Sequence, residues 1–157
     1  MPPPIGLIAG QGHLPLHTAR GIHDAGRPVV CVGLRDQFDD QLPSLCDQFA
    51  TAGMLQLGRW IALLRKFGAT EAVMVGRVRK SAMYDPGRWL RQLPDWRALW
   101  LWYRVLRHDH RNDAVLTAVA NELQRAGITL IDSTQYILDK LADTGPMTRR
   151  QPTAAQQ

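Results

Sequence analysis

The sequence has 157 residues, of which 45% are apolar and 21% are charged, a composition typical of a single globular domain with one sizeable core. No run of residues approaches the roughly 18 apolar residues of a membrane span, and residues 1–4 lack the basic start of a signal peptide, so we expect a cytoplasmic protein. The net charge of +5 is concentrated between Arg77 and Arg111, where nine basic residues accompany three acidic ones and favour an anionic partner.

The first part of the chain predicts a strand, a helix and a second strand. The apolar run 5–9 predicts a buried strand, and helical spacing over residues 14–25 predicts a helix that ends at Gly26. Residues 28–34 are apolar on both faces, as expected of a central parallel strand. Within them, Cys31 lacks any metal-ligand spacing to the second cysteine and is predicted to be a small buried side chain.

The middle of the chain repeats this alternation. A polar, acidic connection contains a short helical turn near residues 42–47, and residues 48–52 predict a weak strand. An apolar stripe predicts a helix from Gly58 to about Phe67. Residues 72–75 then predict another short strand, which ends at a glycine.

The segment 86–106 predicts two helical pieces interrupted at Pro94, because proline removes a backbone donor. Trp96, Trp100 and Tyr103 share one helical face. Such a face is typical of a core helix, a membrane-surface helix or a wall for acyl chains, and the composition alone is weak support for nucleic-acid stacking.

The last elements are a capped helix and a strand. Asn112 or Asp113 caps a helix that Gly127 ends, with a core face predicted at Val115, Leu116, Val119 and Leu123. Residues 128–131 predict the last strand, and Asp132 with Gln135 resembles a capping box for a final helix through about residue 141. Because strands and helices alternate throughout, we expect an α/β fold with a parallel sheet.

The segment Gly10-Gln11-Gly12-His13-Leu14-Pro15 lies where α/β folds bind phosphates, after the first strand and at the start of a helix. The alternative is a tight turn that needs glycine for its dihedral angles. Pro15 stands where the dinucleotide fingerprint requires a third small residue, although Arg35 leaves an NADP-binding oxidoreductase open. The spacing of His13 and His17 suits two metal ligands, but surface histidines are the better interpretation.

A basic loop follows the strand at 72–75. Arg77, Arg79 and Lys80 are predicted to lie at the same carboxyl edge of the sheet as the glycine loop. An arginine there can clamp a phosphate with two parallel hydrogen bonds. The alternative is a solvated basic loop, and a non-enzymatic module that binds anionic lipid or nucleic acid also remains open.

Four segments together resemble one family: IGLIAGQGHLP, QLGRWIALLRKFGATEAVMVGRVRK, NDAVLTAVANELQRAGITLIDSTQYI and MTRRQPT. The family is the UDP-2,3-diacylglucosamine hydrolase of lipid A biosynthesis, the type with a Rossmann-like N-terminal domain and a distinct C-terminal domain. The resemblance implies a Rossmann-like three-layer α/β sandwich with about five mostly parallel strands. Residues 1–144 would form this domain, and residues 145–157 would be a linker toward a second domain that is absent here.

The resemblance implies a reaction in which water attacks the α-phosphorus of UDP-2,3-diacylglucosamine in the presence of magnesium. The products would be UMP and 2,3-diacylglucosamine 1-phosphate. The catalytic residues and most magnesium ligands would lie in the absent domain, so we expect this chain alone to be inactive. Expected partners are the substrate or its lipid product, the absent domain and the cytoplasmic face of the inner membrane, with a homo-oligomer left open and nucleic acid not expected.

By position, the residues implied to line the substrate site are Gly10, Gln11, Gly12, His13, Arg77, Arg79, Asn112 and Asp113. The chain departs from the family at three of these positions. Gln11 stands where a third glycine is usual, His13 where an acidic residue is frequent, and Asn112 precedes Asp113 where two aspartates are common. Asp113 is equally well explained as a helix cap.

Overall fold

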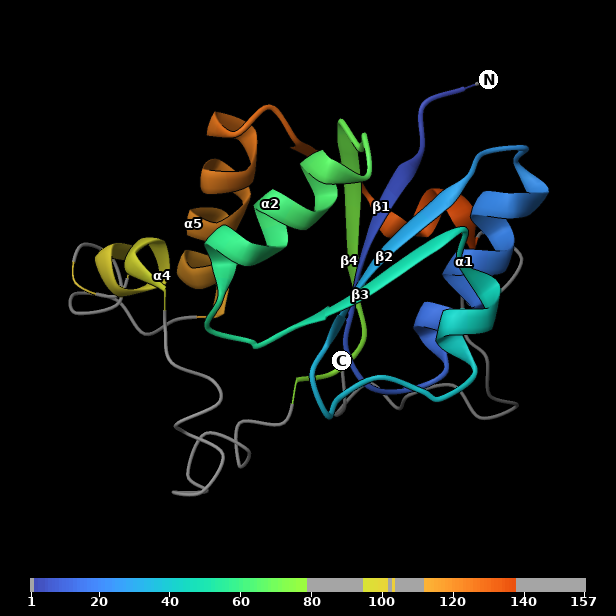
Figure 1. Ribbon diagram of the computed structural model, residues 1–157, viewed down its shortest axis with the longest axis horizontal. Helices are drawn as coiled ribbons and strands as arrows, with labels where there is room; N and C mark the ends of the chain where they lie inside the picture. Colours follow the sequence, from blue (N-terminus) through green and yellow to red (C-terminus); the bar gives the residue numbers. More distant parts are fainter. Residues whose placement is uncertain (1, 79–94, 102, 104–111, 138–157) are drawn as a thin grey trace, which may run out of the picture.

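A computed structural model describes residues 2–78, 95–101, 103 and 112–137. At the centre of these residues lies one five-stranded sheet (Figure 1). All strand pairs are parallel, and the strand order is β3-β2-β1-β4-β5. The strands are β1 (Ile5–Ala9), β2 (Val29–Leu34), β3 (Gln48–Ala52), β4 (Glu71–Val75) and β5 (Thr129–Leu130). This arrangement is the α/β Rossmann-like fold that the sequence predicts.

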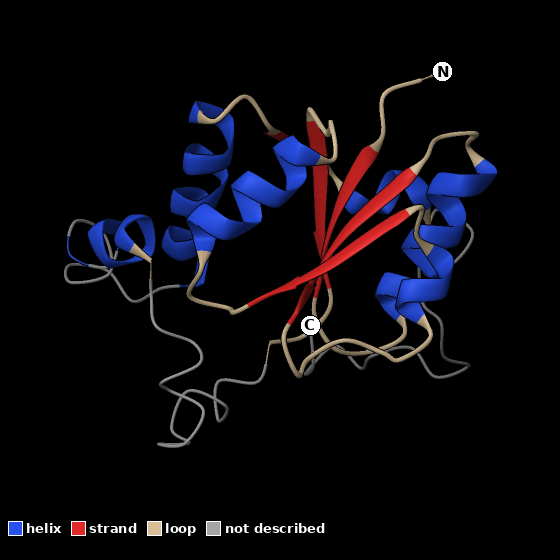
Figure 2. Ribbon diagram, viewed as in Figure 1, coloured by secondary structure: helices blue, strands red, loops and turns tan. Residues whose placement is uncertain are grey.

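Helices cover both faces of the sheet and make a three-layer structure (Figure 2). On one face lie α1 (Leu14–Asp24) and the short 3₁₀ helices η1 (Leu42–Leu45) and η4 (Ser133–Tyr136). The other face carries α2 (Leu57–Lys66), α5 (Asn112–Arg125) and the short α4 (Trp96–Leu101), which packs against α2. Within these described residues, no helix is long and apolar enough to cross a membrane.

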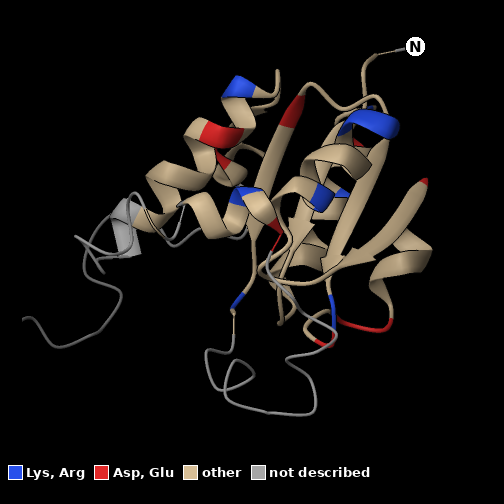
Figure 3. Cartoon of the chain, turned by 60° about the vertical axis from the view of Figure 1, so that its left-hand side comes forward, with Lys and Arg blue, Asp and Glu red and all other residues tan. Residues whose placement is uncertain are grey.

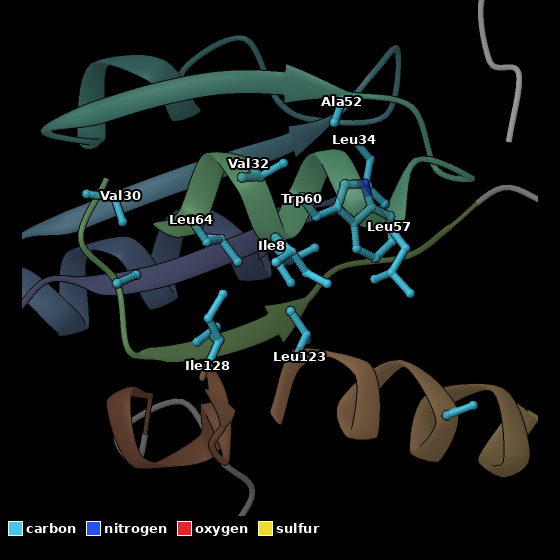
Figure 4. Packing of buried hydrophobic residues seen from close by; sticks show 14 residues of the cluster. Ile8, Val30, Val32, Leu34, Ala52, Leu57, Trp60, Leu64, Leu123 and Ile128 are labelled. Atoms are coloured by element: carbon cyan, nitrogen blue, oxygen red, sulfur yellow. The ribbon is translucent and has the colours of Figure 1, made fainter. Parts of the chain in front are cut away.

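The central strands are apolar throughout because both of their faces are covered. Every residue of β1 and β2 is buried, whereas the edge strand β3 is only partly buried. Alternate residues of β1 therefore enter two separate cores, Ile8 on the α2 side and Leu7 on the α1 side. Figure 4 shows the first core, in which Leu64 and Trp60 of α2 lie over the strands. These cores hold the loops at the strand ends in place.

Most predicted elements are confirmed to within one or two residues. The structure places β1 and β3 at the predicted bounds, begins α2 at Leu57 and shortens the last strand to Thr129–Leu130. Cys31 is fully buried, as predicted, and this burial raises the pKa of its thiol. Of the segment 86–106, residues 86–94, including the interruption at Pro94, lie outside the described residues.

The predicted final helix from Asp132 is wrong for the residues described. The chain forms only the 3₁₀ turn η4, in which Asp132 accepts a hydrogen bond from the Thr134 N–H, and Ile137 leaves helical geometry. The Tyr136 carbonyl packs so closely on α1 that a Cβ at Gly21 would lie 1.8 Å from its oxygen. This contact fixes the turn against α1. The remainder of the predicted helix, together with the predicted linker 145–157, lies outside the described residues.

The predicted core face of α5 is wrong at one position. Leu116 is half exposed, whereas Ala118 and Leu123 are buried. The buried stripe also includes the carboxylate of Glu122, which pairs with Arg125 at 2.5 Å and with Arg97 of α4 at 3.7 Å. A charged side chain therefore occupies a core-facing position because two guanidinium groups neutralise it.

Candidate functional site

The candidate site lies at the carboxyl edge of the sheet between β1 and β4. From β1 the chain moves outward through β2 to β3, and it then returns to place β4 on the opposite side of β1. The connections after β1 and β4 therefore leave the sheet in opposite directions, and parallel α/β sheets bind ligands in the crevice at such a point. The glycine loop and Arg77 follow these two strands directly.

Two backbone hydrogen bonds join the glycine loop to the residues after β4. The Gln11 N–H donates to the Arg77 carbonyl and the Arg77 N–H donates to the Gln11 carbonyl, both at 2.8 Å. One residue earlier, the Gly10 N–H donates to the Val75 carbonyl at 2.8 Å. The two loops are thus held together as an isolated antiparallel bridge at the end of a parallel sheet. Arg77 is fixed beside the glycine loop by its own backbone.

Glycine at two positions of this junction allows the backbones to approach. A Cβ at Gly10 would lie 2.6 Å from the Arg77 carbonyl oxygen, and a Cβ at Gly76 would lie 2.7 Å from the Gly10 carbonyl carbon. Gly76 also has φ 101, which side chains rarely adopt. Gly12 differs from these two glycines, because with φ 109 it has open space where a Cβ would stand. Gly10 and Gly76 therefore allow the backbones of the two loops to pack closely. At Gly12, no other residue occupies the space where a Cβ would stand.

The first turn of α1 presents its positive end to this space. His13 precedes the helix without a side-chain capping hydrogen bond, and no acidic residue lies in the first turn. The helix dipole favours a negative charge here. Among the first-turn amides, Pro15 has no N–H, and the Leu16 and His17 N–H groups donate to the His13 carbonyl at 3.1 and 3.2 Å. The His13 side chain is 84% exposed, and its Nδ1 lies 3.9 Å from the Asp39 carboxylate in the connection after β2. The loops after β1 and β2 therefore adjoin.

Both signs of charge occur in the loops at the lower edge of the sheet in Figure 3. They do not form a metal site among the described residues, where no three His, Cys, Asp or Glu side chains converge. Of the two histidines predicted to lie at the surface, His13 is exposed, whereas His17 is half-buried. The edge is instead built from backbone amides, a helix N-terminus and an exposed arginine, which are groups that bind anions.

Comparison with models of known protein families identifies the family of the domain that contains this site. The model of the LpxI N-terminal domain matches residues 4–140. The chain belongs to the LpxI N-terminal domain family. The resemblance seen in the glycine-rich opening, the central segment and the late helix is therefore confirmed, and the match spans every described element.

A curated relative supports the same assignment. The UDP-2,3-diacylglucosamine pyrophosphatase LpxI of Caulobacter vibrioides is 30% identical over 131 residues, which cover 80% of this chain. The chain spans 42% of the length of that relative.

Solved structures match the LpxI N-terminal domain only at the level of the fold. UDP-glucose-4-epimerase from Stenotrophomonas maltophila, solved with NAD and formylated UDP-arabinopyranose, gives a TM-score of 0.50 at 14% identity. The match covers 82% of this chain and 36% of the epimerase. Pyruvate carboxylase from Rhizobium etli gives a TM-score of 0.48 at 12% identity, covering 83% of this chain and 11% of that protein.

The structure brings five of the predicted site residues together at one edge. They are Gly10, Gln11, Gly12, His13 and Arg77. Asn112 and Asp113 form the first turn of α5, which runs back to the start of β5, so their backbone lies toward the same edge of the sheet. Arg79 lies outside the described residues. The role of each residue in binding stays a prediction.

Asp95 is a structural residue of this region that the sequence pattern does not predict. Its Oδ2 accepts hydrogen bonds from the Gly58 N–H at 2.5 Å and from the Arg59 N–H at 3.2 Å, in the first turn of α2. Its Oδ1 accepts from the Ala98 N–H at 2.8 Å and caps α4. One carboxylate thus joins the N-termini of two helices. An aspartate directly after Pro94 and before a helix is the signal that could have identified this cap.

We expect Asp95→Ala to lower the free energy of unfolding by about 2 kcal/mol, because it removes the cap of α4 and two hydrogen bonds to α2. Urea denaturation measures the loss. Asp24→Ala is the matched control, since Asp24 is exposed at the end of α1 and should change stability by less than about 0.5 kcal/mol. Equal stability of the two variants would refute the joint cap.

Proposed function

We propose that this chain is the substrate-binding N-terminal half of a pyrophosphatase that cleaves UDP-2,3-diacylglucosamine in lipid A biosynthesis. Membership of the LpxI N-terminal domain family and the named activity of the Caulobacter relative support the proposal. In the proposed reaction, water attacks the α-phosphorus and releases UMP and 2,3-diacylglucosamine 1-phosphate. The chain alone binds the nucleotide part of the substrate and does not turn it over.

The single observation that carries the proposal is the bridge between Gln11 and Arg77. It places the guanidinium-bearing residue beside the uncapped N-terminus of α1, so two anion-binding groups share one edge. A pyrophosphate carries charge on both phosphorus centres, and these groups would neutralise it in the ground state and during attack. Arg77 would bind phosphate oxygens in bidentate fashion, while the amides after Gly12 orient the chain of phosphates.

Magnesium is proposed for the reaction, but the residues described here do not fit a site for it. No three His, Cys, Asp or Glu side chains of the described part converge. Hard divalent cations take several oxygen ligands, which the carboxyl edge near β1 and β4 does not gather. We therefore assign to this half only the binding and orientation of the nucleotide, and we propose that the metal ligands and catalytic residues belong to a second domain.

An exposed apolar surface on α4 favours contact with the lipid part of the substrate. Trp96 is 78% exposed, and Leu99, Trp100 and Tyr103 beside it on the chain are also exposed. Aromatic side chains of this kind are favourable at a membrane interface or against acyl chains. We propose that this surface contacts the acyl chains at the cytoplasmic face of the inner membrane, as a peripheral association.

Phosphorus NMR of UDP-2,3-diacylglucosamine with this chain and magnesium tests the proposed function. We expect selective broadening of the two diphosphate resonances without the appearance of UMP. Release of UMP at an ordinary enzymatic rate would overturn the assignment of catalysis to a second domain. Absence of any perturbation would overturn the binding role of this half. Tight binding of NADPH with a fluorescence shift would favour the oxidoreductase alternative instead.

Tryptophan fluorescence with vesicles tests the lipid contact separately. Vesicles that contain anionic phospholipid should shift the emission of the chain to shorter wavelength, and Trp96→Ser should reduce that shift. Trp60→Phe is the comparison, because Trp60 is buried and donates to the Gly53 carbonyl, so it should not report on lipid. An identical shift in both variants would contradict a lipid-facing α4.

A further inference from the structure

The two cysteines of the chain lie in the same hydrophobic core. Cys31, in the middle of β2, is fully buried, and Cys46, directly after η1, is partly buried against the same cluster of apolar side chains. Both are free thiols. The sequence contains no other cysteine, so a disulfide within one copy of this chain can join only these two residues.

The two thiols contact each other. Burial raises the pKa of the Cys31 thiol, and a hydrogen bond with the Cys46 thiol raises it further. A hydrogen bond raises the pKa of a thiol when that thiol is the donor, so the Cys31 S–H donates to the Cys46 sulfur. The Cys46 S–H in turn donates to the Leu42 carbonyl at 3.2 Å. The inner sulfur of this pair belongs to Cys31 and the more accessible one to Cys46.

Hydrogen bonds on both sides of Cys46 hold it beside β2. The Asp47 N–H donates to the Val29 carbonyl at 2.9 Å, and the Asp47 carboxylate accepts from the Val29 N–H at 2.8 Å. The Cys46 N–H itself donates to the Pro43 carbonyl at 3.4 Å and ends η1. Because the backbone before and after Cys46 is fixed, its thiol stays next to the strand that carries Cys31.

A partly exposed thiol in contact with a buried one is suited to stepwise thiol–disulfide exchange. The Cys46 thiolate attacks one sulfur of a small-molecule disulfide and forms a mixed disulfide, while the proton from Cys46 passes to the thiolate that leaves. The Cys31 sulfur then attacks the Cys46 sulfur, and its proton passes to the second small-molecule thiolate as that group leaves. The two protein thiols lose two electrons in total, and one small-molecule disulfide is reduced to two thiols.

We propose that Cys31 and Cys46 are a redox-sensitive pair that forms a reversible disulfide on exchange with a small-molecule disulfide. The bond fastens the end of η1 to the middle of β2. The connection between these two elements carries Asp39, whose carboxylate lies 3.9 Å from Nδ1 of His13 at the start of α1. Oxidation therefore restrains the connection that adjoins the glycine loop. This chemistry does not depend on what the glycine loop binds.

Incubation of the 157-residue chain with oxidised glutathione, followed by alkylation in denaturant and measurement of the intact mass, tests the disulfide. We expect the protein to lose two hydrogen atoms, to take up no alkylating reagent, and to regain two alkylatable thiols after reduction. A mixed disulfide with glutathione that persists at Cys46, a disulfide-linked dimer, or two thiols that stay free would each contradict the bond within one chain.

Two variants and a melting curve separate the roles of the two thiols. Cys31→Ala should accumulate the mixed disulfide at Cys46, whereas Cys46→Ser should not react, because Cys31 is buried. Oxidation of the unmodified sequence should raise the melting temperature by about 5 °C, because it closes residues 31–46 into a loop. Reaction of Cys46→Ser at the rate of the unmodified chain would show that Cys46 is not the entry point. A melting temperature lowered by oxidation would show that the fold does not accommodate the bond.

Discussion

Gly76→Ala should lower the free energy of unfolding by about 3 kcal/mol and separate the two loops of the candidate site. Two effects combine at this position. An alanine at φ 101 is strained, and its Cβ would lie 2.7–2.9 Å from the carbonyl carbon, Cα and N of Gly10. These are backbone atoms of a central strand end, so no flexible side chain can move aside. Relief requires breaking the hydrogen bonds between Gln11 and Arg77.

Gly26→Ala is the matched control for this variant. Gly26 also has positive φ, 72, but nothing lies within 4 Å of a Cβ there, so it measures the backbone strain without the steric contact. We expect it to destabilise by about 1 kcal/mol and to leave nucleotide binding unchanged. Urea denaturation of both variants gives the difference. A Gly76→Ala variant no less stable than Gly26→Ala would show that the close backbone approach is unimportant.

Arg77→Ala should weaken UDP binding by about 100-fold without a comparable loss of stability. The Arg77 side chain is exposed, and the bridge to Gln11 uses only its backbone, which alanine retains. Removal of one guanidinium that binds phosphate in bidentate fashion deletes about 1.5–3 kcal/mol of interaction. Calorimetric titration with UDP measures the change, and thermal unfolding verifies that the fold persists.

Two further variants distinguish a specific contact between Arg77 and phosphate from a general effect of the protein's net charge on UDP binding. Arg77→Lys keeps the positive charge but cannot form two parallel hydrogen bonds, so we expect an intermediate loss of affinity. Arg20→Ala removes the same charge from an exposed position within α1 and should change the affinity by less than about threefold. Equal losses from Arg77→Ala and Arg20→Ala would mean that UDP responds to the net charge of the protein rather than to this edge.

The strands and their parallel arrangement were predictable because a strand that is buried on both faces is apolar at nearly every position. β1 and β2 are apolar at every position except glycine, and glycine follows α1, α2, α5 and β4 closely. The failures have a different origin. Apolar spacing alone predicts Leu116 in the core, but a buried Glu122 paired with two arginines occupies the core-facing stripe.

Features of the site that depend on contacts between distant residues left no pattern in the sequence. The glycine loop and Arg77 could be placed at one edge from strand order, but the bridge between Gln11 and Arg77 pairs residues 66 positions apart. The cap by Asp95 reaches 37 residues back to Gly58.

Amide chemical-shift mapping with UDP tests most directly whether the nucleotide binds where the loops after β1 and β4 meet. We expect perturbations at Gly10, Gly12, His13 and Arg77, with little change at Gly26 and Gly68 beyond the opposite edge of the sheet. Saturable shifts confined to the first set would locate the diphosphate at the bridged edge. Saturable shifts at Gly26 and Gly68, or none at any UDP concentration that the chain tolerates, would contradict it.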